Sequence, residues 1–351
     1  MFDVYGSSRC GYGSTMAPTP GTQEWLDQIV EPVIDPDRAI VDPHHHLWPT
    51  GRGLRYSNPE LVADTTAGHR VVATVFVECG AAYRREGPDE LASLGETEFV
   101  AASADALAQE YPDAPPIAGI VGHVDLTAGG RLDDILDAHV EAAGGRFRGI
   151  RDALARSIEP DAHRIPASNA EGKAYDPSFR AGVERLGERG LTYDSWHFHY
   201  QNREFLDLAR AVPGTTMVLD HFGTPVGVGR FAGRHDDYFD EWAEDVRAIS
   251  TCPNVVAKLG GLIMPDNGFG FDVAPTPPTS DEFLAVQRRW YEHMIDCFGP
   301  ERCMFESNFP VDRLAISYGV LWNAFKRLAA QYSEDEQRAL FHDTATRVYG
   351  L

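Results

Sequence analysis

Residues 71–78 read VVATVFVE, a nearly continuous run of β-branched and apolar side chains. Such runs are typical of strands that are buried on both faces, as in a parallel sheet covered by helices. Similar short runs recur along the chain, and longer stretches with helical periodicity separate them. We therefore predict strands over 39–47, 70–79, 116–125, 147–151, 191–199, 216–222, 254–262 and 302–309.

The chain offers eight predicted strands and eight predicted helices, which we interpret as eight strand-then-helix units, with no helix predicted between the first two strands. Helices are expected over 96–110, 131–143, 177–189, 202–211, 238–249 and 281–297, and two more, over 314–331 and 333–349, follow the last strand. No glycine-rich phosphate loop follows the first strand, which disfavours a doubly wound sheet. The pattern predicts a (β/α)8 TIM barrel over residues 39–351, with an irregular N-terminal arm over 1–38 and a C-terminal helix.

The charge and composition limit the classes of function. The chain carries 31 Lys and Arg against 53 Asp and Glu, a formal net charge of −22. This acidic excess disfavours nucleic acids and anionic membrane surfaces as partners. No apolar run approaches the roughly 20 residues of a membrane-spanning helix, and the N-terminus lacks the pattern of a secretory signal. The five scattered cysteines favour reduced thiols in the cytoplasm. We expect a small-molecule substrate, and a homo-oligomer stays open.

The first strand carries the most informative motif, AIVDPHHHLWP at 39–49. Side chains alternate along a strand, so Asp42, His44 and His46 are expected on one face and His45 on the other. Two imidazoles at the C-terminal end of a barrel strand can bind one divalent metal ion together. We predict His44 and His46 as metal ligands.

Two more histidine clusters end strands. In YDSWHFHYQ at 193–201, His197 and His199 are expected on one face, with His199 nearer the strand end. One of these two could equally be a hydrogen-bonded structural histidine. In MVLDHFG at 217–223, His221 ends an apolar strand, and Asp220 is expected to face away from it. We predict His199 and His221 as further metal ligands.

The last strand and its loop, RCMFESNFPVD at 302–312, supply candidate acid–base groups. Glu306 and Asn308 are expected on one face, and Asp312 lies in the following loop. A buried carboxylate must be paired, so Glu306 could instead be an ion-paired barrel residue, with Lys258 as its partner. Together with His221, these three residues are the predicted catalytic positions.

The substrate pocket is expected around Arg151, which ends the fourth strand. A guanidinium there can bind a carboxylate through two parallel hydrogen bonds, although an inter-strand salt bridge explains it equally well. The other residues predicted to contact the substrate are Trp48, His123 and His197.

Taken together, these motifs resemble the amidohydrolase superfamily, in particular the amidohydrolase-2 group of barrel lactonases and related decarboxylases. The resemblance spans residues 41–351. It rests on seven motifs in order: D-x-H-x-H-L-W at 42–48, G-x-V-D-L at 122–126, R-G-I-R at 148–151, D-x-W-x-x-H-x-Q at 194–201, L-D-H-x-G-x-P at 219–225, S-N-F-P at 307–310 and T-A-x-R-V-Y at 344–349.

The resemblance implies a hydrolytic site at the C-terminal face of the barrel. In metal-dependent members, the first-strand histidines, a later histidine and an aspartate of the eighth strand hold one ion, which activates water. We expect one divalent ion, with Zn preferred over Mn or Fe. No lysine ends the fourth strand to bridge two metals, because Arg151 stands there.

The chain departs from the family pattern at one position, because Asn308 replaces the eighth-strand aspartate. An amide cannot act as a general base and is a poor metal ligand. Glu306 could supply the missing carboxylate, Asp312 could fold back to do so, or the protein could work without metal.

Three functions are compatible with these motifs. The first is a hydrolase that opens a small, carboxylated lactone or ester by metal- or histidine-assisted attack of water. The second is a non-oxidative, metal-dependent decarboxylase on the same fold. The third is a degenerate barrel that only binds a ligand.

Overall fold

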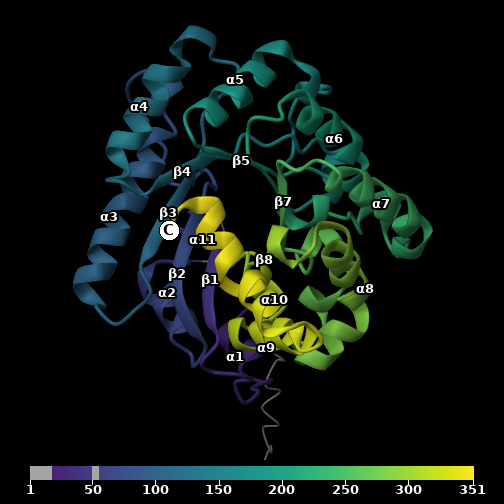
Figure 1. Ribbon diagram of the computed structural model, residues 1–351. Helices are drawn as coiled ribbons and strands as arrows, with labels where there is room; N and C mark the ends of the chain where they lie inside the picture. Colours follow the sequence, from purple (N-terminus) through teal and green to yellow (C-terminus); the bar gives the residue numbers. More distant parts are fainter. Residues whose placement is uncertain (1–17, 50–54) are drawn as a thin grey trace, which may run out of the picture.

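The computed structural model describes residues 18–49 and 55–351, and within them eight parallel strands form one sheet in the order β1 to β8. Helices surround the ring of strands, which confirms the predicted TIM barrel (Figure 1). The strands are β1 (Ala39–His45), β2 (Arg70–Val77), β3 (Ile117–Gly122), β4 (Phe147–Ile150), β5 (Thr192–Ser195), β6 (Met217–Leu219), β7 (Val255–Leu259) and β8 (Cys303–Phe305).

The barrel closes where the segment after β8 meets β1. A parallel bridge joins His45 to Phe309, and the His46 amide donates to the Phe309 carbonyl over 2.7 Å. The Asn308 amide donates to the His44 carbonyl over 3.0 Å. Closure therefore brings the histidine motif of β1 directly beside the segment that follows β8.

The outer layer is α2 (Asn58–Thr65), α3 (Leu94–Glu110), α4 (Leu132–Ala142), α5 (Pro177–Glu188), α6 (Asn202–Ala211), α7 (His235–Ser250), α8 (Ser280–Phe298) and α9 (Tyr318–Ala329). The sequence predicted all of these except α2. The sequence at the N-terminus of α2 does carry a helix-start signal, because Ser57 and Glu60 form a capping box and a proline lies in the first turn.

The chain ends in α10 (Glu334–Arg338), a π-helical turn over Ala339–Asp343, and α11 (Thr344–Tyr349). Ala345 and Tyr349 of α11 pack against apolar side chains of the strands, including Val41, Val218 and Met304. The C-terminal helix therefore contributes to the barrel interior as well as to the outer layer.

All eight predicted strands extend beyond the observed ones, and the excess matters most at β8, which ends at Phe305 before Glu306 and Asn308, and at β5 and β6. β5 ends at Ser195 and β6 at Leu219, whereas the apolar pattern extended them to residues 199 and 222. His199 begins a short 3-10 helix, and His221 adopts a left-handed backbone with φ of 52°. Strand alternation therefore does not govern the side chains of His197, His199 or His221.

The described part of the N-terminal arm lies on the same chain's barrel. Within it, α1 (Gln23–Leu26) buries Trp25, whose indole donates to the Ala274 carbonyl over 3.1 Å. Glu31 accepts hydrogen bonds from the Ser280 amide and the Asn323 side chain. The remainder of the predicted arm, residues 1–17, lies outside the described residues.

No helix in residues 18–49 or 55–351 has the length and apolar content needed to cross a membrane. Cys79, Cys252, Cys297 and Cys303 are free thiols, and Cys10 lies outside the described residues.

Candidate functional site

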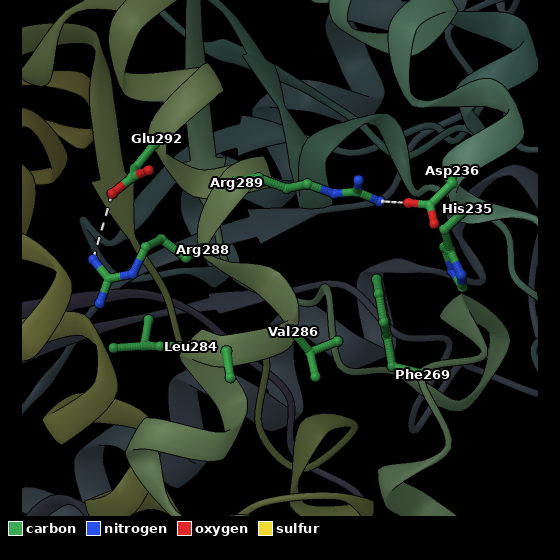
Figure 2. Close-up of a pocket in the computed structure, with 9 residues that line it drawn as sticks. His235, Asp236, Phe269, Leu284, Val286, Arg288, Arg289 and Glu292 are labelled. Atoms are coloured by element: carbon green, nitrogen blue, oxygen red, sulfur yellow. Dashed lines mark hydrogen bonds and ion pairs between the residues drawn. The ribbon is translucent and has the colours of Figure 1, made fainter.

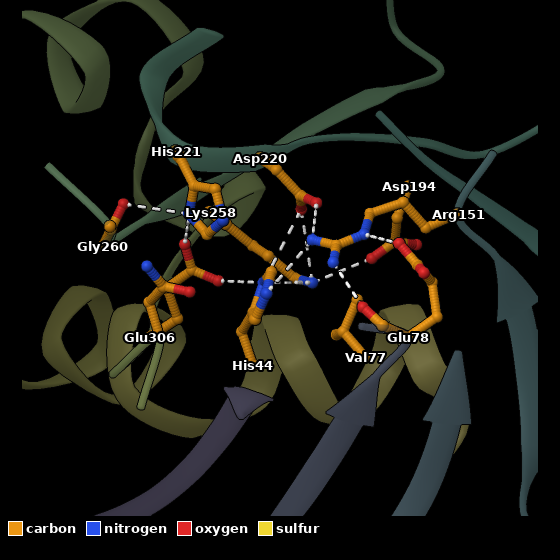
Figure 3. Close-up of polar contacts among 12 residues, drawn as sticks. His44, Val77, Glu78, Arg151, Asp194, Asp220, His221, Lys258, Gly260 and Glu306 are labelled. Atoms are coloured by element: carbon orange, nitrogen blue, oxygen red, sulfur yellow. Dashed lines mark hydrogen bonds and ion pairs between the residues drawn. The ribbon is translucent and has the colours of Figure 1, made fainter. Parts of the chain in front are cut away.

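Eight polar side chains meet at one end of the barrel interior (Figure 3). They come from seven of the eight strands or from the residues directly after them. We call this group the barrel cluster; it consists of His44, Glu78, Arg151, Asp194, Asp220, His221, Lys258 and Glu306. All but Glu78 are buried.

His221 and Glu306 form its shortest contact between two side chains. His221 Nδ1 lies 2.7 Å from Glu306 Oε1 and 3.3 Å from the Gly260 carbonyl oxygen. Both neighbours are acceptors, so Nδ1 carries a proton, and in the neutral imidazole Nε2 keeps its lone pair. Among the described residues, Nε2 has no hydrogen-bond partner. Burial raises the pKa of Glu306, and the neighbouring His221 and Lys258 oppose that shift.

The turn after β6 directs two side chains into the cluster. Because the strand ends at Leu219 and His221 and Phe222 have φ of 52° and 63°, the chain leaves the strand path. Asp220 and His221 therefore both reach the cluster. The expectation that Asp220 faces away from His221 was wrong, because it assumed a continuing strand.

The turn after β7 makes room for this pair. Gly261 has φ of 72°, and a Cβ there would lie 2.2 Å from His221 Nδ1. A Cβ on Gly260 would lie 2.4 Å from Glu306 Cγ. The two glycines therefore let His221 and Glu306 pack against the backbone.

His44 lies between Glu306 and two cations. Its Nδ1 is 2.8 Å from Glu306 Oε2 and 3.3 Å from Lys258 Nζ, and its Nε2 is 3.4 Å from Arg151 Nη1. Burial and the Lys258 charge lower the pKa of His44 well below its ordinary value, so the imidazole is neutral. Although Glu306 Oε2 is close to His44 Nδ1, it has no hydrogen bond of acceptable geometry within the described residues.

These residues fit a divalent metal ion. The ligand atoms of His44, His221 and Glu306 all lie within 4.8 Å of one another. Neutral imidazoles and a carboxylate are the donors that Zn²⁺ takes, and an ion would satisfy the unpartnered Glu306 oxygen. His46 stands beside this trio, with its ring centre 5.0 Å from that of His44. Its Nδ1 bonds the Val77 carbonyl over 2.8 Å, which leaves Nε2 for another partner.

The structure does not bring the two other predicted histidines to this trio. His197 uses both nitrogens, with Ser195 Oγ at 2.9 Å and Asn202 Oδ1 at 3.1 Å. His199 accepts from the Val226 amide over 3.1 Å, and its ring stacks on Tyr238 at 4.3 Å. Both belong to the loops between β5 and β6, because β5 ends before them.

The two cations of the cluster are paired with carboxylates. Arg151 Nε donates to Glu78 over 2.8 Å, and Nη1 lies 3.4 Å from Asp220. Lys258 Nζ lies 2.8 Å from Asp194 and 3.4 Å from Asp220. The inter-strand salt bridge considered for Arg151 is therefore present, and the direct ion pairs of Lys258 are with these aspartates and not with Glu306.

The remaining predicted residues lie around the cluster. His123 contacts the Arg151 carbonyl through Nδ1 at 3.1 Å, and Trp48 stacks on His46 at 6.0 Å. Asn308 has φ of 54° and donates through Nδ2 to Asp312 Oδ1 over 2.9 Å.

Two carboxylates were considered as replacements for the family aspartate, and they have different neighbours. Asp312 is buried, which raises its pKa well above the ordinary value, and it accepts from Asn308 and from the Gly261 amide. Glu306 contacts both His44 and His221. Glu306 is therefore the better placed of the two.

Sequence reasoning gave no functional role to Asp194, Asp220 or Lys258. The available signal was chemical: each is an ionisable residue in or directly after a predicted strand, as in the run NVVAKLG at 254–260. Burial of a charge is costly unless it is paired, so three such residues on neighbouring strands indicate one ion network.

A hollow at a different place is formed by α7, α8 and the loop around Phe269 (Figure 2). It is lined by His235, Phe269, Leu284 and Val286, and Arg289 pairs with Asp236 across 2.5 Å. None of the residues predicted to carry chemistry lines it, so the barrel cluster remains the candidate active site.

Comparison with known proteins defines the class. The family model described as Amidohydrolase matches residues 41–351, and the chain belongs to this family. It is an enzyme of the hydrolase type, as the family resemblance in its motifs implied.

Particular relatives cover nearly the whole chain. A protein of Burkholderia multivorans named L-fucono-1,5-lactonase is 30% identical over 89% of this chain and 96% of its own length. The uncharacterized protein y4mH of Sinorhizobium fredii is 32% identical over 89% of this chain and 99% of its own. A crystal structure of a B. multivorans amidohydrolase with bound Zn has a TM-score of 0.67 and 26% identity, and the match covers 89% of this chain and 99% of that one.

Proposed function

We propose that this enzyme hydrolyses a small lactone, with His221 as the general base and Glu306 as the carboxylate that orients it. The observation that carries the proposal is the buried His221–Glu306 contact of 2.7 Å, which leaves Nε2 without a partner among the described residues. The similarity to a protein named L-fucono-1,5-lactonase supports a lactone as the substrate class.

The steps follow from the contact between His221 Nδ1 and Glu306. Water attacks the lactone carbonyl carbon while His221 Nε2 takes its proton, and Glu306 stabilises the resulting imidazolium. The bond between the carbonyl carbon and the ring oxygen then breaks. His221 returns the proton to that oxygen, and the product is a hydroxy acid.

A divalent ion offers an alternative use of the same residues. His44, His221 and Glu306 would hold it, and when bound it would supply Lewis-acid polarisation of the carbonyl and a lower pKa for water. In both cases the neutral state of His44 is maintained by burial, Lys258 and Arg151.

The charges of the cluster favour a neutral lactone over the carboxylated one expected from sequence. Arg151 is already paired with Glu78 and Asp220, and Lys258 with Asp194 and Asp220. A substrate carboxylate would have to displace one of these partners. We therefore expect higher kcat/KM for a neutral sugar lactone than for a dicarboxylated pyrone lactone.

The test is ring opening of L-fucono-1,5-lactone, followed by acid release and compared with 2-pyrone-4,6-dicarboxylate. His221→Asn should abolish turnover, whereas His342→Asn, a substitution on the half-buried outer turn, should not. Release of CO2 from an aromatic acid without lactone hydrolysis would instead support the decarboxylase alternative.

Metal analysis of the same preparations separates the two uses of His221. About one equivalent of Zn, Mn or Fe that is lost in His44→Asn and also in Glu306→Gln would support metal binding by the His44, His221 and Glu306 trio. Full activity after chelation, with no bound metal, would leave His221 as the base.

A further inference from the structure

The C-terminal helix reaches the barrel cluster through Tyr349. Tyr349, the last residue of α11, is buried, and its OH donates to Asp194 Oδ2 over 2.6 Å. Figure 1 shows α11 near the centre of the ring of strands. Tyr349 closes the motif TATRVY at 344–349, to which the proposed function assigns no role.

The Tyr349 hydroxyl shares its acceptor with a catalytic-site cation. Asp194 Oδ2 accepts from Tyr349 and lies 2.8 Å from Lys258 Nζ, and Asp194 Oδ1 accepts from Thr192 over 2.9 Å. Three donors from α11, β7 and β5 therefore hold one buried carboxylate. A carboxylate with this many fixed donors has one orientation available to it.

Lys258 connects the Asp194 carboxylate to His44. Its Nζ is bound to Asp194 and lies 3.3 Å from His44 Nδ1 and 3.4 Å from Asp220 Oδ1. It also lies 5.3 Å from the centre of the Tyr349 ring. The ammonium is thus held from one side by α11 and Asp194, and it faces His44 on the other.

We infer that Tyr349 is a positioning residue for the reaction, which acts through Asp194 and Lys258 to hold the charge beside His44. Without the hydroxyl, Asp194 would keep Lys258 as its main donor and could rotate toward it. The ammonium would then be shared differently among Asp194, Asp220 and His44. The last turn of α11 therefore helps to position side chains of the active site.

The test is Tyr349→Phe, which keeps the ring and removes only the hydroxyl. The matched control is Tyr238→Phe, whose buried hydroxyl donates to the Val226 carbonyl over 2.8 Å and has no contact with the cluster. With the lactone substrate, kcat should fall about tenfold in Tyr349→Phe at nearly unchanged KM, because a small displacement in an active site slows the reaction itself. The control should keep its kcat, and the melting temperature should fall by a similar amount in both variants.

A second readout does not depend on turnover. The kcat comparison rests on the proposed function, whereas this readout does not. The ring ¹⁵N shifts of His44 in the full-length protein should change in Tyr349→Phe and not in Tyr238→Phe. Unchanged His44 shifts together with equal kcat in the two variants would overturn the inference. Absence of lactone turnover in the wild type would overturn the proposed function alone, and the shifts would still decide the role of Tyr349.

Discussion

At the scale of single residues, Glu306 holds the position from which one carboxylate reaches two histidines. Its two oxygens lie 2.7 Å from His221 Nδ1 and 2.8 Å from His44 Nδ1. The Asn308 side chain has no hydrogen bond to either ring and donates to Asp312 instead. The amide at position 308 is therefore compatible with catalysis, provided that Glu306 supplies the charge.

Glu306→Gln should lower kcat by about 10²–10⁴-fold, the usual contribution of a positioned acid–base group. The glutamine can still accept from His221, but it cannot stabilise an imidazolium. Steady-state kinetics on the lactone would measure this, with Asp312→Asn as the comparison. A larger loss in Asp312→Asn than in Glu306→Gln would transfer the role to Asp312.

At the scale of elements, the turns after β6 and β7 set the geometry of the site. The left-handed residues after Leu219 direct Asp220 and His221 to the same cluster. The glycines after β7 allow the His221 ring and the Glu306 side chain to approach the backbone closely. These short turns decide the geometry of the site more than the strands do.

Gly261→Ala should therefore impair the site. The new Cβ would meet the His221 ring at 2.2 Å, and alanine is strained at φ of 72°. We expect a loss of about 1–3 kcal/mol in the free energy of unfolding, together with a fall in kcat. Gly214→Ala is the control, because a Cβ there meets nothing within 4 Å. Equal kcat in both variants would contradict the close-packing argument.

The arm is fastened to α9 by a lysine with an unusual environment. Lys326 Nζ donates to the Asp35 carbonyl over 2.7 Å and lies 2.8 Å from His69 Nδ1. Burial lowers the pKa of Lys326 to about 8 from its ordinary 10.5, and the nearby Asp35 partly opposes this shift. Between these two pH values the unfolded chain binds the proton and the folded chain does not.

Stability should consequently rise with pH in this window. The free energy of unfolding of the wild type, relative to Lys326→Met, should increase from pH 8 toward 10.5 and decrease as the pH falls through 8. Urea unfolding of both proteins across this range measures the difference, in which other titrating groups cancel. A difference that does not vary with pH would show that the folded-state pKa is not lowered.

At the scale of the whole molecule, both ends of the described chain are tied to the barrel. The arm buries Trp25 against the loop at Ala274, and α11 packs Ala345 and Tyr349 into the interior. The barrel itself closes through the hydrogen bonds between β1 and the segment after β8. Distant parts of the sequence therefore stabilise the same core.

Trp25→Ala should cost about 3–5 kcal/mol of unfolding free energy, as expected for a buried tryptophan. The kcat of the folded fraction should stay near that of the wild type, because Trp25 has no contact with the barrel cluster. Val30→Ala, in the same arm and 81% exposed, should be nearly neutral. Denaturant unfolding measures the change in stability, and lactone turnover of the folded protein measures kcat.

Local sequence patterns were sufficient to predict the barrel, its order of strands, every outer helix except α2, and the presence of His44, His221 and Glu306 near the strand ends. These features follow from periodicity and from motif order, which need no knowledge of long-range contacts. The motifs also indicated the amidohydrolase family, which the family match confirms.

Which side chains meet, in contrast, depends on tertiary contacts. The left-handed turn at His221 and the early end of β5 break the two-residue alternation from which the facing of Asp220, His197 and His199 was predicted. The pairing of Lys258 with Asp194 and Tyr349 joins β5, β7 and the last helix, residues up to 155 positions apart. Local patterns cannot contain such contacts, because chain closure and side-chain packing create them.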